Sequence, residues 1–509
     1  MVKYESVKIY FLLGAMMLFC IGLSIVFFMQ QSLRLDEAQS LWQSSRSAGN
    51  IITLVSQDVH VPLYHEMLHF WRLFVGDSVT SARAMSLFFY VLSIPAIYFL
   101  GRQAYGRNVG LFGALLLSIS PFMNWYGSEI RMYTLLTFVT ILNQYFFVKI
   151  LTKGKLLYGT EQYKSLWLGY GVTAVLGVFV HYFFFLSLFS QALFYFLRSS
   201  MFPKKSFHNF IIVVGFLLVF MGPWFAFVLS QGQAVFQTPY LPTPTTVNLF
   251  STFSQFLFGF QNDNLNTVFL SFWPITIILG FLALRRDMRL SPVSEYLLIS
   301  VIVSITTAFF VSFIVPVFVS RYLIFTVPAM FLLLASLFES YTPRTAISFR
   351  FGLIALMLVM LSIEIVNPTT PVKEDYKQAA LFVAEHATVQ DVVVLSAPFT
   401  IYPVQYYYTG TAPLVTLPIW DRYSHGGTPS LKLEDIPKEV AQVSGSSQNM
   451  WLLLSYDQGY QKNVQTYFDT HYQQLLKKDF SPGLVLYQYK LRYDTTANSL
   501  IKPTTTSAQ

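Results

Sequence analysis

Long stretches without a charged side chain most constrain how this chain folds. The first of them, residues 9–33, contains no Asp, Glu, Lys or Arg, and a membrane-crossing helix needs about 20 mostly apolar residues. Only 11% of the 509 residues are charged, whereas soluble globular domains carry about 25%. A water-soluble fold of this length would lack the polar side chains to cover its surface. We therefore expect an integral membrane protein, and the same composition excludes a disordered chain.

Ten further apolar runs follow, so we expect eleven membrane-spanning helices. The charge-free stretch 165–197 could be one long helix, but its length fits two spans that are divided at His181–Tyr182. The stretch 206–262 is interpreted as one span followed by a loop, because prolines between 239 and 244 stop a helix. The runs after the first lie near residues 84–100, 108–125, 132–150, 165–180, 182–197, 209–229, 266–284, 295–315, 322–338 and 351–366.

Lysine and arginine are unevenly distributed between alternate loops, and this bias orients a membrane protein. If the N-terminus is cytoplasmic, the inside segments carry sixteen of these residues and the outside loops of the membrane domain carry six. An odd number of spans then places the C-terminus outside. The formal net charge of +8 therefore comes from inside loops, and we predict no nucleic-acid partner.

The composition changes near residue 367, where a smaller unit is expected. Helical and strand-like patterns alternate there, which predicts an α/β fold. We divide the chain into a membrane domain (1–366), an extracytoplasmic α/β domain (367–495) and a disordered tail (496–509). The expected helices of the α/β domain lie near 375–386, 434–443 and 458–476, and the expected strands near 391–395, 450–455 and 484–489, with a loop rich in Pro, Tyr and Gly after the first strand.

The first outer loop, about 34–80, is rich in ionisable residues. Asp36 and Glu37 directly follow the first span, so we expect their carboxylates at the outer membrane surface. A partly desolvated carboxylate can have a raised pKa and act as a general base, although such a pair is also a common polar boundary. Helical spacing over 38–42 and 64–74 predicts two interfacial helices on the bilayer.

Metal binding is an open alternative in the same loop. His65 and His69 have the spacing of zinc ligands, but three protein ligands are normally needed, and an amphipathic surface helix explains this pair better. Asp58 and His60 could supply two ligands for a divalent cation, or belong to a solvated turn. The single cysteine, Cys20, excludes disulfides, thiolate zinc sites and iron–sulfur clusters. No cofactor is predicted beyond this optional cation.

Further candidate residues lie on other outer turns. Each has a simple structural explanation, such as an ion pair, a helix end or an aromatic anchor. The predicted topology nevertheless places all of them on the same side as Asp36. Acids and isolated arginines at an outer interface suit a reaction between an anionic lipid phosphate and an external nucleophile. These residues are Glu129, Arg131, Tyr133, His181, Arg321 and Tyr322.

Five short motifs, taken in order, resemble those of the GT-C glycosyltransferases of family 39. This family includes protein O-mannosyltransferases and the aminoarabinose transferases that modify lipid A. The resemblance covers roughly residues 1–366, and the C-terminal unit is similar to the corresponding domain of bacterial members more loosely. Val61 stands where relatives often have proline. The motifs occupy residues 35–38, 58–64, 129–133, 181–182 and 321–323.

This resemblance implies a GT-C fold and an inverting enzyme that uses a polyprenyl-phosphate sugar donor. The enzyme would lie in the bacterial cytoplasmic membrane and modify an extracytoplasmic glycan, lipid or protein hydroxyl. Asp36 would be the general base, and the donor tail would lie between spans near 230–262. Glu37 would assist Asp36; Arg321, Arg131 and Tyr322 would bind the donor phosphate; Asp58, His60, Glu129, Tyr133 and His181 would position the substrates.

A transporter or flippase of a lipid-linked or hydrophobic solute is the alternative function. It predicts ionisable groups at mid-membrane depth and inverted repeats of broken helices. The expected span interiors are nearly devoid of charge, and no internal repeat is visible. The sequence therefore favours the transferase.

Overall fold

A computed structural model describes residues 2–58, 60–230, 243–261, 263–271, 291–340, 344–366, 374–423 and 428–491. The chain forms two compact units, and these do not follow a single division along the sequence. The membrane unit consists of residues 1–31 and 40–371, and the smaller unit of residues 32–39 and 372–509. The short segment 32–39 therefore groups with the C-terminal residues, although it directly follows the first span.

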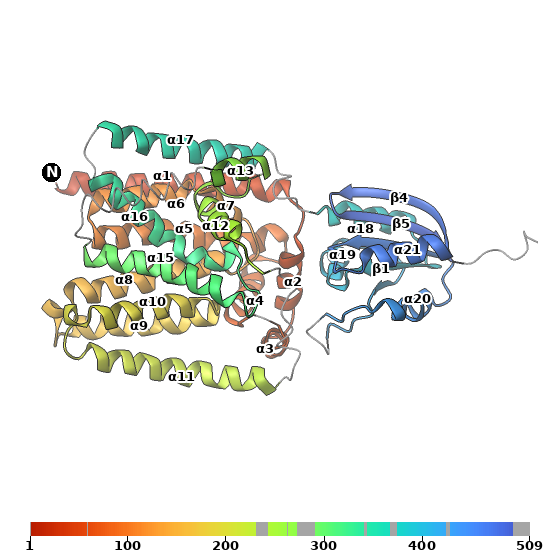
Figure 1. The fold of residues 1–509 in the computed structure, drawn as a ribbon, viewed down its shortest axis with the longest axis horizontal. Coiled ribbons are helices and arrows are strands. Elements are labelled where there is room, and N and C mark those ends of the chain that lie inside the picture. The colour runs from red at the N-terminus through yellow and green to blue at the C-terminus, as the bar shows by residue number, and fades with distance from the viewer. Residues whose placement is uncertain are drawn as a thin grey trace, which may run out of the picture. The chain divides into compact units, whose positions relative to one another are not determined.

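Eight helical segments within the described residues are long and apolar enough to cross a membrane. The long helices of this unit run side by side (Figure 1). They bury one another's apolar side chains and leave other apolar side chains exposed, as expected for helices that face lipid. The eight are α1 (Val2–Gln30), α5 (Val79–Ala104), α8 (Tyr133–Leu157), α9 (Glu161–Val180), α11 (Ser206–Ser230), α15 (Pro292–Val311), η3 (Ser320–Thr326) continued by α16 (Val327–Ser340), and α17 (Arg344–Val366).

Two more predicted spans correspond to shorter or broken helices. The span expected at 108–125 is a bent pair, α6 (Arg107–Ser118) and α7 (Pro121–Gly127), with 61° between the helices. The bend lies where Pro121 cannot donate a hydrogen bond to the preceding turn. Helix α10 (Phe184–Leu197) is apolar but has only 14 residues. The span predicted at 266–284 lies mostly outside the described residues, and α13 (Asp263–Ser271) covers its start.

The division predicted at His181 is confirmed. This residue ends α9 with an extended backbone, at φ −161° and ψ 135°. Its Nδ1 accepts a hydrogen bond from the Phe183 backbone N–H at 3.1 Å. The imidazole therefore stabilises the turn that leads into α10.

The first outer loop contains three short helices, one more than predicted: α2 (Leu35–Ser44), α3 (Ala48–Ser56) and α4 (Leu63–Val75). Ser47 precedes α3 with an extended backbone. Ile51 and Val55, one turn apart, are fully buried. Helices α3 and α4 lie at the end of the bundle where α1 ends (Figure 1). Packing therefore stabilises a helix whose nine residues were too few for a clear periodic pattern.

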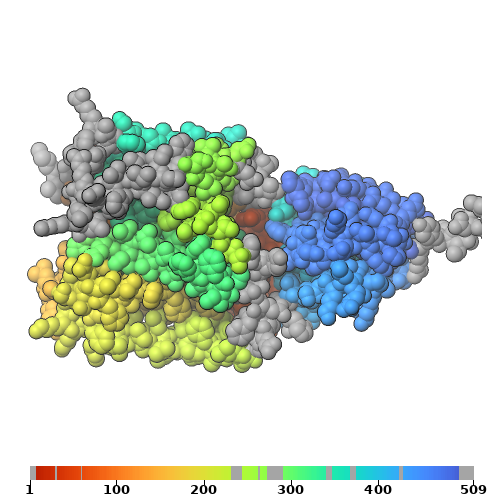
Figure 2. Space-filling model, viewed as in Figure 1, coloured from red at the N-terminus to blue at the C-terminus, as the bar shows by residue number. Residues whose placement is uncertain are grey.

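The stretch predicted as a loop after α11 contains a helix, α12 (Thr246–Phe258). Thr245 and Asn248 form a capping box at its start, so a new helix begins just beyond the last of the prolines. Its Phe256 ring packs against Phe122 of α7, with 5.2 Å between ring centroids. Figure 2 shows α12 and α13 in yellow-green at the surface of the membrane unit.

Helix α12 ends at Gly259, where the backbone has a φ of +71°. A Cβ atom there would approach Pro121 Cβ to 2.6 Å and Glu364 Oε2 to 3.2 Å. Both the left-handed backbone and the close approach therefore require glycine. The contact joins the end of α12 to the bend between α6 and α7.

A buried polar network joins α8, α9, α10 and α15. Gln191 Nε2 donates to Asn143 Oδ1 at 2.8 Å and to Tyr296 Oη at 3.2 Å, and Tyr170 Oη donates to Gln191 Oε1 at 2.8 Å. Polar groups in hydrocarbon need such partners, and these hydrogen bonds hold transmembrane helices together.

The smaller unit is built on a five-stranded mixed sheet with strand order β2-β1-β3-β5-β4. Strand β1 pairs in parallel with β2 and β3, whereas β5 is antiparallel to both β3 and β4. The α/β fold predicted for this region is confirmed. The strands are β1 (Asp391–Ser396), β2 (Leu414–Thr416), β3 (Asn449–Ser455), β4 (Gln473–Ser481) and β5 (Leu484–Lys490).

Helices cover both faces of this sheet. The alternating side chains of β1 divide between the faces, with Val392 and Val394 in one core and Val393 and Leu395 in the other. The first core includes residues of α20 (Ile436–Ser444) and α21 (Gln461–His471), and the second includes residues of α18 (Tyr376–His386) and α19 (Ile401–Tyr407).

Three details of the smaller unit were predicted wrongly. The helix expected at 458–476 ends at His471, because residues from Gln473 onward form β4 at the edge of the sheet. This strand is mostly exposed and carries Lys477 and Lys478. Such charges keep an edge strand from pairing with another chain, but they also remove the alternation of apolar residues by which a strand is recognised. Helix α19 and strand β2 lie in the segment expected to be a loop. The predicted tail, 496–509, lies outside the described residues.

We expect Gln191→Leu to destabilise the membrane unit, because it removes three buried hydrogen bonds that join four helices. The cost should be about 1–2 kcal/mol, seen as a lower thermal unfolding midpoint in detergent. Phe189→Leu is the control, since Phe189 of the same helix is 52% exposed. An unchanged midpoint for Gln191→Leu would show that the network contributes nothing to stability.

Candidate active site

The predicted site residues divide between the two units. Asp36 and Glu37 belong to the segment 32–39 of the smaller unit. The other eight belong to the membrane unit: Asp58, His60, Glu129, Arg131, Tyr133, His181, Arg321 and Tyr322.

Asp36 and Glu37 occupy the first turn of α2, where negative charge is favourable because of the helix dipole. Glu37 is fully buried, and its Oε2 accepts a hydrogen bond from the Arg34 backbone N–H at 2.9 Å. This contact gives Glu37 a role in starting the helix. Asp36 is only half-buried, so its carboxylate is the more accessible of the two.

Residues of the C-terminal part of the smaller unit surround the same segment. Ser32 Oγ donates to the Glu374 carbonyl at 3.0 Å, and the Leu33 N–H donates to Tyr407 Oη at 3.0 Å. Burial and then Glu374 raise the pKa of Tyr456, and Asp36 acts in the same direction. Sequence reasoning missed these partners, since a serine, a glutamate and tyrosines far along the chain carry no local signal.

Arg131 connects two other elements in the membrane unit. Its Nη2 lies 2.8 Å from His60 Nε2, and its Nη1 donates to Ser40 Oγ at 3.2 Å. A guanidinium only donates, so His60 Nε2 must accept, which places the imidazole proton on Nδ1. Both Arg131 and His60 are buried. The sequence did not indicate Ser40.

Hydrogen bonds in the turn between α7 and α8 fix the backbone of Arg131 and so orient its side chain. The Arg131 N–H donates to the Glu129 carbonyl at 2.8 Å, and Ser86 Oγ of α5 donates to the Arg131 carbonyl at 3.3 Å. Glu129 is also buried, at 3% exposure. The predicted motif 129–133 therefore forms a buried turn fixed at its backbone.

Three aromatic rings from distant elements form one wall. Tyr133 begins α8, His181 lies at the α9–α10 turn, and Tyr322 lies in η3. The His181 and Tyr322 centroids are 5.2 Å apart, and the Tyr133 centroid lies 6.3 Å and 6.5 Å from them. The Arg321 guanidinium carbon is 5.5 Å from the Tyr322 centroid. With the contact between Arg131 and His60, the structure thus brings together four of the five predicted motifs.

Electrostatics connect this wall to Arg131. Burial lowers the pKa of His181 to about 3, and the nearby His60, Arg131 and Arg321 act in the same direction. His181 therefore stays neutral at neutral pH. Two guanidinium groups lie beside uncharged imidazole, which is an arrangement suited to an anion. We call Arg131, Arg321, His60 and His181 the guanidinium cluster.

His65 corrects one interpretation of the sequence. It was explained as part of a surface helix, but it is fully buried and stacks on His60 with 5.9 Å between ring centroids. Burial lowers the pKa of His65 to about 3; His60 and Arg131 lower it further, and Asp58 opposes them. His69, one turn later, instead lies 2.9 Å from the Ser44 carbonyl through its Nδ1.

Asp58 and His60 already have protein partners. Asp58 Oδ2 accepts a hydrogen bond from Gln43 Nε2 at 3.1 Å, and His60 Nε2 contacts Arg131. Within the described residues, no three His, Cys, Asp or Glu side chains are grouped so as to hold a metal ion. Asp58 Oδ2 and His60 Nε2 are therefore already used in contacts with Gln43 and Arg131.

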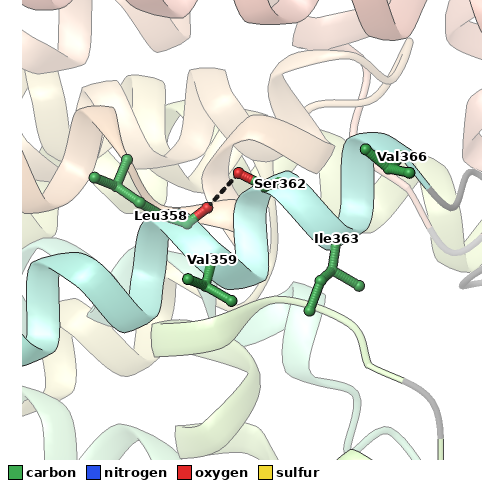
Figure 3. A pocket seen from close by; sticks show the side chains of 5 residues that line it. All are labelled: Leu358, Val359, Ser362, Ile363 and Val366. Atoms are coloured by element: carbon green, nitrogen blue, oxygen red, sulfur yellow. Dashed lines mark hydrogen bonds between the residues drawn. The ribbon is translucent and has the colours of Figure 1, made fainter.

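An open groove of about 440 Å³ runs along α17 and is lined by apolar side chains and one serine. Figure 3 shows the serine, Ser362, donating to the Leu358 carbonyl at 2.8 Å, so its hydroxyl is already used. The lining therefore suits hydrocarbon and offers no group for chemistry. The residues are Leu358, Val359, Ser362, Ile363 and Val366.

Comparisons with known proteins agree with this architecture. Residues 60–225 match a sequence model of the family described as dolichyl-phosphate-mannose-protein mannosyltransferase. No curated protein matches the chain. The structure is similar to ArnT from Cupriavidus metallidurans in the apo state, with a TM-score of 0.61, 12% identity, and coverage of 93% of this chain and 98% of that one. The chain has the GT-C fold.

Two further structures support the GT-C fold. ArnT from the same organism bound to undecaprenyl phosphate has a TM-score of 0.60 and 13% identity, with 93% of this chain and 98% of that chain covered. An apo oligosaccharyltransferase from Archaeoglobus fulgidus has a TM-score of 0.51 and 13% identity, with 87% and 69% covered. The predicted resemblance is thus confirmed, and the family match supports the class of GT-C membrane glycosyltransferases.

The buried histidines predict that stability falls as the pH is lowered. The ordinary histidine pKa of 6.5 applies to the unfolded chain, whereas both His65 and His181 have a pKa of about 3 when folded. Between these values the unfolded chain binds more protons, so each histidine lowers stability by at most about 1.4 kcal/mol per pH unit as the pH falls.

We therefore expect the thermal unfolding midpoint in detergent to fall between pH 7 and pH 4.5. His65→Gln should reduce this pH dependence, whereas His208→Gln, a change at an exposed position, should not. An identical pH dependence in His65→Gln and the unmodified protein would contradict the neutral, buried state of His65.

Proposed function

We propose that the chain is an inverting glycosyltransferase that moves a sugar from a polyprenyl-phosphate donor to a hydroxyl group outside a bacterial cytoplasmic membrane. The single observation that carries this proposal is the guanidinium cluster, in which buried Arg131 and half-buried Arg321 lie near neutral His181. The family match and the GT-C fold support it. One structure with this fold holds undecaprenyl phosphate, the chemical class of the proposed donor.

The guanidinium cluster would stabilise the leaving group. As the bond between the anomeric carbon and the phosphate oxygen breaks, negative charge accumulates on the lipid phosphate. Fixed guanidinium donors in a buried site favour that charge strongly, because little reorganisation is needed. In this proposal Arg321, Arg131 and Tyr322 bind the phosphate. His60 holds Arg131 in place through its Nε2 contact.

Asp36 would act as the general base. Its carboxylate takes the proton from the acceptor hydroxyl while that oxygen attacks the anomeric carbon from the side opposite the phosphate, and the configuration inverts. Glu37 would support the helix turn that carries Asp36, as its contact with the Arg34 N–H suggests. Asp58, Glu129, Tyr133 and His181 would position the substrates.

The orientation of the chain is part of the proposal. A cytoplasmic N-terminus and an extracytoplasmic C-terminal domain agree with the distribution of Lys and Arg between the loops. The division into a membrane domain (1–366) and an α/β domain (367–495) is proposed with it. No second function is proposed.

Asp36→Asn should lower the rate of sugar transfer by roughly 10²- to 10⁴-fold, because the general base is lost. The purified protein would be mixed with radiolabelled polyprenyl-phosphate sugars and candidate acceptors, and loss of label from the lipid would be followed. Binding of the lipid donor and the unfolding midpoint should stay unchanged. Asp77→Asn is the matched control, since that acid of the same loop is 79% exposed. Full activity of Asp36→Asn would refute its role.

Arg321→Gln should lower the rate roughly 10²- to 10³-fold and weaken binding of polyprenyl phosphate, because a fixed positive charge is removed from the leaving group. Arg321→Lys should recover part of the loss, since lysine keeps the charge but not the planar fork. Arg46→Gln is the control, because Arg46 stacks on Trp42 in the first outer loop.

The same protein in lipid vesicles also tests the alternative function. Movement of labelled lipid across the vesicle membrane, without transfer of the sugar to any acceptor, would contradict the proposal and favour a flippase.

A further inference from the structure

The end of the first span is held from a neighbouring helix. Arg83 of α5 is 1% exposed, and its Nη1 donates to the carbonyl oxygens of Phe28 at 3.2 Å and Gln31 at 3.0 Å. Carbonyl groups at the end of a helix have no partner within the helix, and a cation there also opposes the negative end of the dipole. Arg83 therefore fixes the point at which the chain leaves α1.

The end of α2 is held in the same way. Arg72 of α4 donates through Nη1 to the Leu41 carbonyl and to Ser44 Oγ, both at 2.8 Å. His69 Nδ1 lies 2.9 Å from the Ser44 carbonyl, and a carbonyl oxygen only accepts, so Nδ1 donates. Two side chains of α4 thus bind the last turn of α2.

The segment between these two attachments carries Asp36. Residues 31–34 have no regular secondary structure, and α2 is one continuous helix from Leu35 to Ser44. Fixing the last turn of a short helix fixes the direction of its axis, and with it the position of residues in its first turn. Without both attachments, the start of α2 would be held only by the hydrogen bonds that Ser32 and Leu33 make with Glu374 and Tyr407.

We infer that Arg83, Arg72 and His69 form a bracket that positions the Asp36 carboxylate for proton abstraction. This inference rests on the proposed function, in which Asp36 is the general base. The three are positioning residues and touch no substrate. A displacement of about 1 Å at a reacting group can lower a rate roughly 100-fold. Loss of the bracket should therefore lower the rate of sugar transfer measurably, even if Asp36 shifts only slightly.

Arg72 offers the sharpest test, because its contacts can be separated. Its Nη1 serves the bracket, whereas its Nε donates to exposed Asp77 at 2.7 Å. Arg72→Gln should lower kcat roughly 10- to 100-fold, with KM for the lipid donor changed less than about twofold. Arg72→Lys, which still donates to a carbonyl, should recover part of kcat. Asp77→Asn, which removes the charge of the partner but not the bracket, should behave like the unmodified protein.

A distance measurement separates positioning from general destabilisation. Nitroxide labels on Gln39→Cys of α2 and Gly49→Cys of α3 would report how widely the orientation of the α2 axis varies. Native Cys20 is buried and should not take up the label. Arg72→Gln should broaden the distance distribution and Arg72→Lys should narrow it again. Arg83→Gln should also broaden it and lower kcat. If Arg83→Gln does not fold, the Arg72 variants decide the question.

The outcomes distinguish the bracket from the proposed function. If the unmodified protein transfers sugar and Asp36→Asn does not, but Arg72→Gln keeps its kcat, the bracket is refuted and the function stands. A fall in kcat without a broader distance distribution also refutes the bracket. Full activity of Asp36→Asn overturns both, because the bracket would then have no base to position.

Discussion

The contact between Arg131 and His60 is the interaction on which the rest of the membrane site depends. A guanidinium buried beside a membrane must have its donors satisfied. Arg131 donates to Ser40 of α2 and to His60 before α4, while its carbonyl binds Ser86 of α5. Arg131 therefore connects three elements, two through its side chain and one through its backbone, and Arg321 with its aromatic wall lies close by.

The spans could be predicted from the sequence because charged side chains are unfavourable in the bilayer core. Each span is therefore a long run of uncharged residues that is easy to recognise. The division at His181 and the alternation of strands and helices near the C-terminus followed from equally local patterns. Helices α3 and α12 were missed because tertiary packing stabilises them: Ile51 and Phe256 are fully buried. Strand β4 was missed because an edge strand has no buried face to produce alternation.

The candidate site was predictable only in part. Ionisable residues such as Arg131, His181 and Arg321 stand out in an apolar sequence, and the structure brings them together. Ser40 and Gln43 do not stand out, because hydroxyl and amide side chains occur everywhere, and their role depends on which charged group they meet. The burial of His65 could not be predicted either. The spacing of His65 and His69 indicates a helix, but it does not show whether His65 faces solvent or stacks on a buried ring.

The grouping of residues 32–39 with the smaller unit has a consequence for protein engineering. Ser32 and Leu33 are bound by Glu374 and Tyr407, so truncating the chain after the last span would remove the partners of the segment that carries Asp36. The C-terminal domain therefore cannot be exchanged by itself, because it holds the partners of this segment. A chimera that exchanges it between relatives would also need to exchange residues 32–39.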